Sequence, residues 1–197
     1  MHENMNYLYL IISWIVYFSL HSVFALTSVK NAFYSIGLKP QKYRLIFNMF
    51  GLVLLIPIFA ISSFIESSTI FSPNRIIKFA GLLCAGWGIV VIQIAFKSYD
   101  TKAFLGLGNL DVENEFKTNG ILKKVRHPLY SGSILLILGY FLFDPKLSTL
   151  TSSIMLILYI IIGIQFEERK LIKTFGNKYI EYKKKTPMLI PRFWKKS

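Results

Sequence analysis

The sequence predicts an all-α, polytopic membrane protein with about five transmembrane helices. Of its 197 residues, 53% are hydrophobic and only 17% are charged, and the mean hydropathy is +0.48. An ordinary soluble domain of this size is less apolar. Four or five spans of ~20 residues with their connections use up the whole length. We therefore expect one integral-membrane domain over residues 1–197 and no separate soluble domain.

Five apolar runs mark the expected spans, at residues 5–26, 45–65, 76–96, 129–143 and 147–166. The first three are each long enough to cross a hydrocarbon core of ~30 Å. The fourth is short, and Asp144 and Pro145 separate it from the fifth by a tight turn. These two runs are therefore predicted to form a helical hairpin.

The basic residues predict the orientation. Of the 23 lysines and arginines, 20 lie in the segments 27–44, 97–127 and 167–197, and the other three are Arg75, Lys78 and Lys146. Five spans with the N-terminus outside place all three rich segments in the cytoplasm, as the positive-inside rule requires. The net charge of +13 then faces anionic lipid, so nucleic acid is not the expected partner.

The third expected span carries small residues at a four-residue spacing, which predicts close packing against another helix. They are Ala80, Cys84 and Gly88, with Gly81 and Ala85 beside them. We expect Cys84 to pack on this face rather than to act as a reactive thiol. One cysteine and three scattered histidines make no known metal-binding pattern, so no metal is expected.

The segment 98–132 has features of a ligand site rather than of a simple connection. It ends in Arg126-His127-Pro128-Leu129-Tyr130-Ser131-Gly132. Pro128 is suited to the first position of a helix, and a helix N-terminus can hold a carboxylate or a hydroxyl-rich ligand. Tyr130 and Gly132 would lie in the first turn, to stack on that ligand or to admit it. Alternatively, Arg126 and His127 anchor the fourth span among lipid headgroups.

The second such segment is the tail from residue 166 to 194, which begins with Glu167 and Glu168 directly after an apolar run. Two carboxylates at the edge of a low-dielectric site attract an ammonium or sulfonium group strongly. The structural alternative is that one of them pairs with a basic neighbour, namely Arg169, Lys173 or Lys124. The run 183–185 of three lysines is expected to face lipid.

These residues resemble a known family. Arg126-His127-Pro128-x-Tyr130-x-Gly132, Glu167-Glu168-x-x-Leu171 and Phe175-Gly176-x-x-Tyr179-x-x-Tyr182 are similar to motifs of the integral-membrane S-adenosylmethionine-dependent methyltransferases. That group includes isoprenylcysteine carboxyl methyltransferases and phospholipid methyltransferases. The likeness covers roughly residues 114–191. Short matches in the N-terminal half, such as His21-Ser22 and Tyr43-Arg44-Leu45, resemble the NnrU-like and methanethiol S-methyltransferase branch.

The resemblance implies a cytoplasmic S-adenosyl-L-methionine pocket that the C-terminal tail closes, in a protein of a bacterial inner (cytoplasmic) membrane. The catalytic positions that it implies are Arg126, His127 and Tyr130. The cofactor-binding positions that it implies are Glu115, Phe116, Lys117, Leu122, His127, Pro128, Tyr130, Gly132, Glu167, Glu168 and Tyr179. We expect His127→Ala and Glu168→Ala to weaken cofactor binding without unfolding the protein, because both positions lie at the membrane edge.

Two departures from the family pattern bear on the methyl acceptor. Leu122 stands where carboxyl-methylating relatives usually have a tyrosine, and the arginine that those relatives use for a substrate carboxylate is absent from residues 163–165. Arg126 or Arg169 remain possible substitutes. The sequence thus favours a small or lipophilic acceptor, above all a thiol, with phospholipid or isoprenylcysteine carboxyl methylation as the alternative.

Methyl transfer from a sulfonium is an in-line displacement, in which positioning and exclusion of water do most of the work. An acceptor thiol would lose its proton to solvent, His127 or Tyr130. The alternative from another class is a non-catalytic membrane transporter or scaffold. Against a transporter, the spans hold almost no ionisable residue apart from His21, and no inverted repeat is visible.

Overall fold

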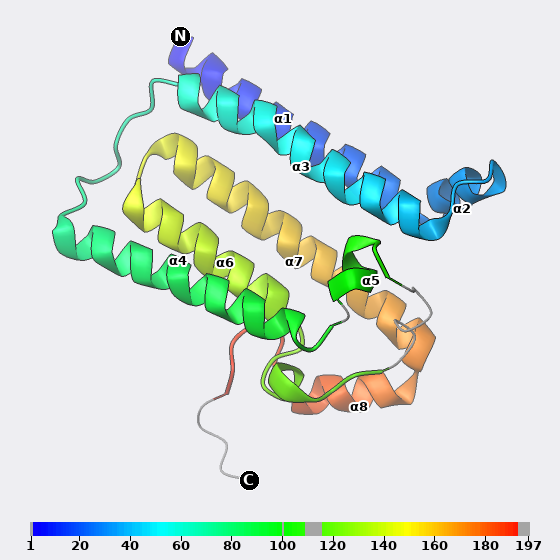
Figure 1. Cartoon of the computed structure of the whole chain (residues 1–197). Coiled ribbons are helices and arrows are strands. Elements are labelled where there is room, and N and C mark those ends of the chain that lie inside the picture. The colour runs from blue at the N-terminus through cyan, green and yellow to red at the C-terminus, as the bar shows by residue number, and fades with distance from the viewer. Residues whose placement is uncertain (1, 100, 109–115, 193–197) are drawn as a thin grey trace. The chain divides into compact units, whose positions relative to one another are not determined.

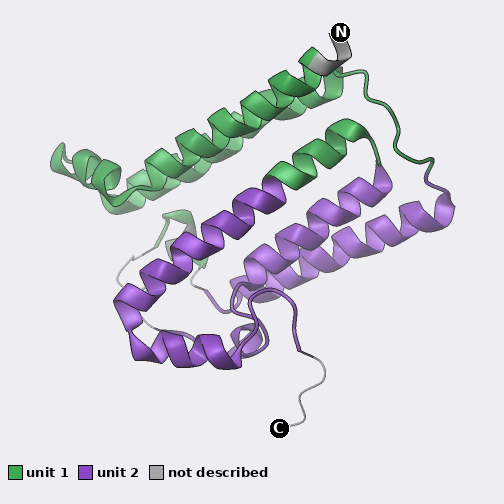
Figure 2. Cartoon of the chain, turned by 180° about the vertical axis from the view of Figure 1, so that it is seen from behind, with its two compact units in different colours: residues 1–72, 100–114, 145–155 green, residues 73–99, 115–144, 156–197 purple. Residues whose placement is uncertain are grey.

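The computed structural model describes residues 2–99, 101–108 and 116–192, and within them it confirms an all-α fold (Figure 1). In these described ranges the regular elements are helices, with one isolated β-bridge between Thr69 and Lys146. The chain forms two compact units, shown in Figure 2. Unit 1 comprises residues 1–72, 100–114 and 145–155; unit 2 comprises residues 73–99, 115–144 and 156–197.

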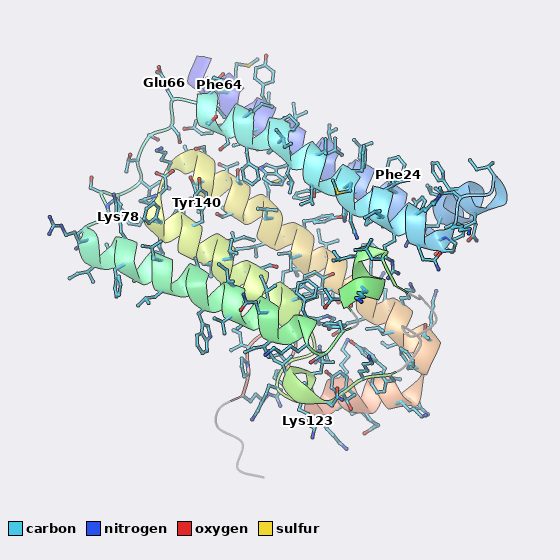
Figure 3. All side chains as sticks on the ribbon, viewed as in Figure 1. Phe24, Phe64, Glu66, Lys78, Lys123 and Tyr140 are labelled. Carbon is cyan, nitrogen blue, oxygen red and sulfur yellow. The ribbon has the colours of Figure 1, made fainter. Side chains whose placement is uncertain are left out.

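Unit 1 is built on two long helices, α1 (His2–Ala25) and α3 (Pro40–Phe64), with the short helices α2 (Thr27–Ser35) and α5 (Thr101–Leu105). The Tyr43 hydroxyl of α3 donates a 2.6 Å hydrogen bond to the carbonyl of Phe24, which Figure 3 labels near the end of α1. Helix α3 begins at Pro40, before the apolar run that predicted it, because proline at the first helical position loses no hydrogen bond.

Unit 2 contains α4 (Arg75–Phe96) packed against α6 (Pro128–Phe143), and small residues make the contact. A Cβ atom on Gly88 would lie 2.6 Å from the carbonyl oxygen of Gly132, and one on Gly139 would lie 2.5 Å from the Ala85 nitrogen. The Cys84 thiol donates to the Leu135 carbonyl at 3.3 Å. The predicted close packing is confirmed for Gly81, Cys84, Ala85 and Gly88, whereas Ala80, predicted on the same face, is exposed.

Helix α7 runs from Leu147 to Phe175, so the hairpin with α6 has the predicted turn at residues 144–146. The span was predicted over residues 147–166, and the helix that contains it continues to Phe175. The apolar run stops at Phe166, but the following Glu, Arg, Lys and Leu residues all favour helix and continue it. Gly176, with φ +55°, separates α7 from α8 (Asn177–Lys185). Glu167 and Glu168 are therefore helical residues of α7.

Among the described residues, four helices are long and apolar enough to cross a membrane, over Met5–Ala25, Pro40–Phe64, Arg75–Phe96 and Leu147–Phe175. The 16-residue α6 is apolar but shorter, about 24 Å at 1.5 Å per residue. Large apolar side chains such as Leu52, Ile56, Phe79 and Trp87 are exposed on the long helices. Exposed apolar surface of this extent is expected for helices that face lipid, so the chain is an integral membrane protein.

Candidate functional site

The loop before α6 is anchored by the C-terminal part of unit 2. A 3₁₀ helix, η2 (Gly120–Lys123), ends at Lys123, which Figure 3 labels near α8. The buried Leu122 accepts a 2.7 Å hydrogen bond from the Tyr182 hydroxyl of α8. The N–H groups of Arg126 and His127 donate to the carbonyls of Pro187 and Met188 at 2.9 and 3.1 Å. The expected return of the tail to this loop is thus observed, through backbone hydrogen bonds.

Glu168 lies at the centre of a buried ionic cluster. The guanidinium of Arg126 donates to Glu168 Oε1 through Nε and Nη2, both at 2.7 Å. His127 Nε2 lies 3.2 Å from the same oxygen, and Lys183 Nζ lies 2.5 Å from Oε2. The side chains of Glu168, His127 and Arg126 are only 3, 3 and 8% exposed. Both carboxylate oxygens are therefore engaged by basic groups, which come from the loop before α6 and from α8.

This pairing corrects two predictions from the sequence. Glu168 was expected to pair, if at all, with Arg169, Lys173 or Lys124, but its partners come from the loop before α6 and from α8. Lys183 was expected to face lipid, but its ammonium group contacts Glu168. Lys184, in contrast, has its ammonium group 2.7 Å from the exposed carboxylate of Glu181.

Glu167 differs from its neighbour in exposure and in partners. Its side chain is 43% exposed, and its Oε2 lies 3.8 Å from His127 Nδ1. Tyr130 interacts with the Glu167 carboxylate, and its ring centroid is 5.8 Å from that of His127. Burial, helped by the nearby Glu167 carboxylate, raises the pKa of the Tyr99 hydroxyl to about 12. Glu167, His127, Tyr130 and Tyr99 thus form a group with one accessible carboxylate.

An aromatic group lies beside the ionic cluster. The Phe116 ring centroid is 5.1 Å from that of Phe175, 6.0 Å from Tyr179 and 5.6 Å from Tyr182. The Tyr179 hydroxyl is buried without a hydrogen bond to the described residues. Burial, and then the nearby Glu168 carboxylate, raises the pKa of Tyr179 above its ordinary value. Such an unpaired buried hydroxyl is a group that a bound ligand can satisfy.

The structure brings Arg126, His127, Tyr130, Glu167 and Glu168 together. Phe116, Leu122 and Tyr179 lie close by in the same unit. Pro128 is buried as the first residue of α6, and the side chain of Lys117 is half-buried. Glu115 lies outside the described residues.

Gly132 was expected to admit a ligand, but a Cβ there would lie 2.6 Å from Ile92 Cγ1 of α4. Gly132 therefore serves the contact between α4 and α6.

Sequence reasoning missed Lys183 as a member of the cluster. The usable signal is its position four residues after Tyr179, which places both residues on one face of α8. It also underestimated burial, since His127 and Glu168 are only 4 and 2% exposed. From these contacts we now predict that Glu168→Ala destabilises the fold, because the substitution would leave Arg126 and Lys183 without their shared anion.

The sequence matches the family described as Phospholipid methyltransferase over residues 76–178, more than half of the chain. The chain therefore belongs to this family of integral-membrane methyltransferases, which confirms the resemblance that the motifs indicated. The matched part of the chain includes Arg126, His127, Glu167 and Glu168, and it ends before Lys183.

Individual relatives agree with this family. Over 123 residues the chain is 32% identical to the Methanethiol S-methyltransferase of Pseudomonas deceptionensis (56% of this chain, 44% of that protein). Over 129 residues it is 33% identical to that of Crocosphaera subtropica (61% and 49%). Over 75 residues it is 40% identical to the Protein-S-isoprenylcysteine O-methyltransferase of Schizosaccharomyces pombe (38% and 32%). The matches span about half or less of the length of these curated relatives.

Proposed function

We propose that this protein transfers a methyl group from S-adenosyl-L-methionine to a small or lipophilic acceptor at the membrane, with a thiol of the methanethiol type as the favoured acceptor. One observation carries the proposal. The segment that matches the family contains Arg126, His127, Glu167 and Glu168, and these residues form one charged cluster although two apolar helical stretches separate them in the chain. The names of the relatives support the choice of a thiol.

The residues of the cluster fit a cofactor of this kind. S-Adenosylmethionine supplies a methyl group on a sulfonium, and it also carries an ammonium, a carboxylate and hydroxyl groups. Glu167 offers an accessible carboxylate for a cationic group, and the Tyr179 hydroxyl offers an unsatisfied buried polar atom. Glu168 is already engaged by Arg126, Lys183 and His127, so we assign it to holding the site together.

His127 has a defined role in this scheme. An ionised carboxylate only accepts hydrogen bonds, so Glu168 Oε1 fixes the proton of a neutral His127 on Nε2. Nδ1 is then unprotonated and faces Glu167 at 3.8 Å. We propose that Nδ1 of His127, or the hydroxyl of Tyr130 beside it, handles the proton of an acceptor thiol.

The surroundings of residues 163–165 support a neutral acceptor over a carboxylate. Ile164 is fully buried, and a Cβ on Gly163 would meet no atom within 4 Å. Of the two substitutes for the missing arginine, Arg126 is engaged by Glu168, and the exposed Arg169 has its guanidinium 5.7 Å from the Phe166 ring centroid. Burying a substrate carboxylate without a cationic partner would weaken binding by about 2–5 kcal/mol.

A second candidate is carboxyl methylation of an isoprenylated cysteine. The 40% identity to the fission-yeast enzyme favours it, although that match covers only 75 residues. The family description also names phospholipids. Both alternatives keep the same cofactor and the same cluster, and they differ in the acceptor.

For the topology, we propose five spans with the N-terminus outside and the C-terminus in the cytoplasm. Tyr182 bonds to Leu122, and Lys183 bonds to Glu168, so the loop before α6 and helix α8 lie on the same side of the membrane. An even number of crossings must then separate them, which supports α6 and α7 as a hairpin of two crossings. A reporter fused after Lys185 is expected to report a cytoplasmic location; an external location would contradict the topology and the site with it.

The proposed acceptor is tested with methyl-labelled S-adenosylmethionine and the purified full chain. The acceptors to compare under identical conditions are methanethiol, a longer alkyl thiol, a farnesylcysteine carboxylate and phosphatidylethanolamine. We expect labelled thioether from the thiols and far less product from the others. A clear preference for the carboxylate or the phospholipid would contradict the thiol and leave methyl transfer standing.

A further inference from the structure

Lys183 contacts the cluster in two ways that are independent of each other. Its ammonium nitrogen lies 2.5 Å from Glu168 Oε2. Its backbone carbonyl accepts a 3.1 Å hydrogen bond from Arg126 Nη1, and the carbonyl of Thr186, one turn further on, also accepts from Nη1. A substitution at position 183 removes the side-chain contact alone, because any residue there keeps the carbonyl.

The two oxygens of Glu168 have different partners. Oε1 accepts from Arg126 and from His127 Nε2, whereas Oε2 accepts from Lys183. A carboxylate that is held at both oxygens cannot turn about its terminal bond without breaking an ionic hydrogen bond. Lys183 therefore fixes the orientation in which Oε1 meets His127.

We propose that Lys183 is a positioning residue for the methyl transfer proposed above: by holding Glu168 Oε2 it fixes the Nε2–H tautomer of His127 and directs Nδ1 toward Glu167. The residue lies beyond the segment that matches the family, residues 76–178. The groups that face His127 are Glu167 and Glu168 from α7 and Tyr130 from α6, with Lys183 of α8 acting through Glu168.

The chain offers a matched control at the next position. Lys184 belongs to the same helix, but its ammonium group pairs with Glu181, and these side chains are 66 and 57% exposed. Lys183→Met and Lys184→Met remove the same charge and leave the same side chain, one inside the cluster and one outside it. Lys183→Arg restores a cation at the cluster.

The experiment uses the full chain in detergent with ¹⁵N-labelled histidine, since His127 is one of only three histidines. At pH 8 we expect the His127 nitrogens of the wild type to show the Nε2–H tautomer. In Lys183→Met they should show a mixture of the two tautomers, while Lys184→Met matches the wild type and Lys183→Arg returns toward it. Turnover of the thiol should fall about tenfold or more in Lys183→Met alone, as when an orienting carboxylate is lost.

Identical His127 signals in Lys183→Met and the wild type would overturn the proposal, as would an equal change in Lys184→Met. If Lys183→Met does not fold, Lys183→Gln is judged by the same signals. The proposal rests on the proposed function for its catalytic meaning, but the nitrogen spectra need no turnover. A wild type without methyl transfer but with the expected spectra would therefore refute the function and leave the positioning of His127 by Lys183 intact.

Discussion

Glu167 and Glu168 are neighbours in α7, yet the side chain of Glu167 is 43% exposed and that of Glu168 is 3% exposed. The difference follows from the helix, which directs successive side chains about 100° apart, so only one of the two can enter the cluster with Arg126 and Lys183. We expect the roles of the two glutamates to differ as their exposure does. We expect Glu168 to stabilise the fold, and the more exposed carboxylate of Glu167 to be the one that a ligand can reach.

The first prediction compares Glu168→Gln with Glu167→Gln. Glu168→Gln leaves two cations beside a neutral amide and should lower the free energy of unfolding by about 3 kcal/mol. Glu167→Gln should change stability little and should weaken cofactor binding. Thermal unfolding and S-adenosylmethionine titration of both variants check this. Equal stability of the two variants would mean that the ionic cluster does not stabilise the fold.

A second prediction concerns the contact between α4 and α6. Gly88→Ala places a methyl group 2.6 Å from the Gly132 carbonyl oxygen and should destabilise unit 2 by about 1–3 kcal/mol. Gly86 of the same helix has no atom within 4 Å of its Cβ position, so Gly86→Ala should be neutral or stabilising by up to about 1 kcal/mol. Thermal unfolding in one detergent measures both. A loss of the same size at Gly86 would argue against the small-residue contact.

The third prediction concerns the segment that follows α8. The Ser131 hydroxyl donates to the Leu189 carbonyl at 2.7 Å, whereas the Ser133 hydroxyl donates to Leu129 in its own helix. Ser131→Ala should lower the free energy of detaching residues 186–189 from the loop by about 1 kcal/mol. The amides of Arg126 and His127, which donate to this segment, should then exchange about fivefold faster. Ser133→Ala should leave that exchange unchanged. Hydrogen exchange read by mass spectrometry tests the pair of variants.

The fourth prediction concerns high pH. Burial raises the pKa of Tyr182 to about 12, although Arg126 nearby opposes the shift. In the unfolded chain a tyrosine ionises near pH 10. Between about pH 10 and 12, Tyr182 keeps its proton in the native state and loses it in the unfolded chain. The free energy of unfolding that Tyr182 contributes therefore falls as the pH rises from about 10 to 12. The absorbance of tyrosinate at 295 nm is followed against pH in the wild type and in Tyr182→Phe. The difference between the two titration curves, which is due to Tyr182, should have its midpoint near pH 12. A midpoint near 10 would show that Tyr182 is exposed.

The four long apolar helices and the turn between α6 and α7 could be predicted from the sequence, because apolar length and a proline-containing turn are local properties. The small-residue face of α4 was also readable, since a four-residue spacing defines one side of a helix. The end of α7 was not, because hydrophobicity stops at Phe166 while helix propensity continues to Phe175. Composition marks the edge of the membrane and not the end of a helix.

The two motifs of the site could likewise be found in the sequence, but not their ionic partners. Glu168 has several lysines and arginines near it in the sequence, and the spacing of Lys183 from Tyr179 identifies a shared helix face without showing that this face meets Glu168. The choice depends on α8 folding back after Gly176, which brings Lys183 to Glu168. The packing of Gly132 against α4 was not apparent either, since a glycine next to a motif can serve a neighbouring helix as well as a ligand.

The most direct test of the central claim is calorimetric titration of the purified full chain with S-adenosyl-L-methionine. Glu181→Gln serves as the control for Glu167→Gln, because Glu181 is an exposed carboxylate on α8 paired with Lys184. We predict saturable binding at one site, competition by S-adenosylhomocysteine, at least about tenfold weaker binding in Glu167→Gln as expected for a lost charged contact, and no change in Glu181→Gln. Absence of saturable binding by the folded wild type would contradict the account.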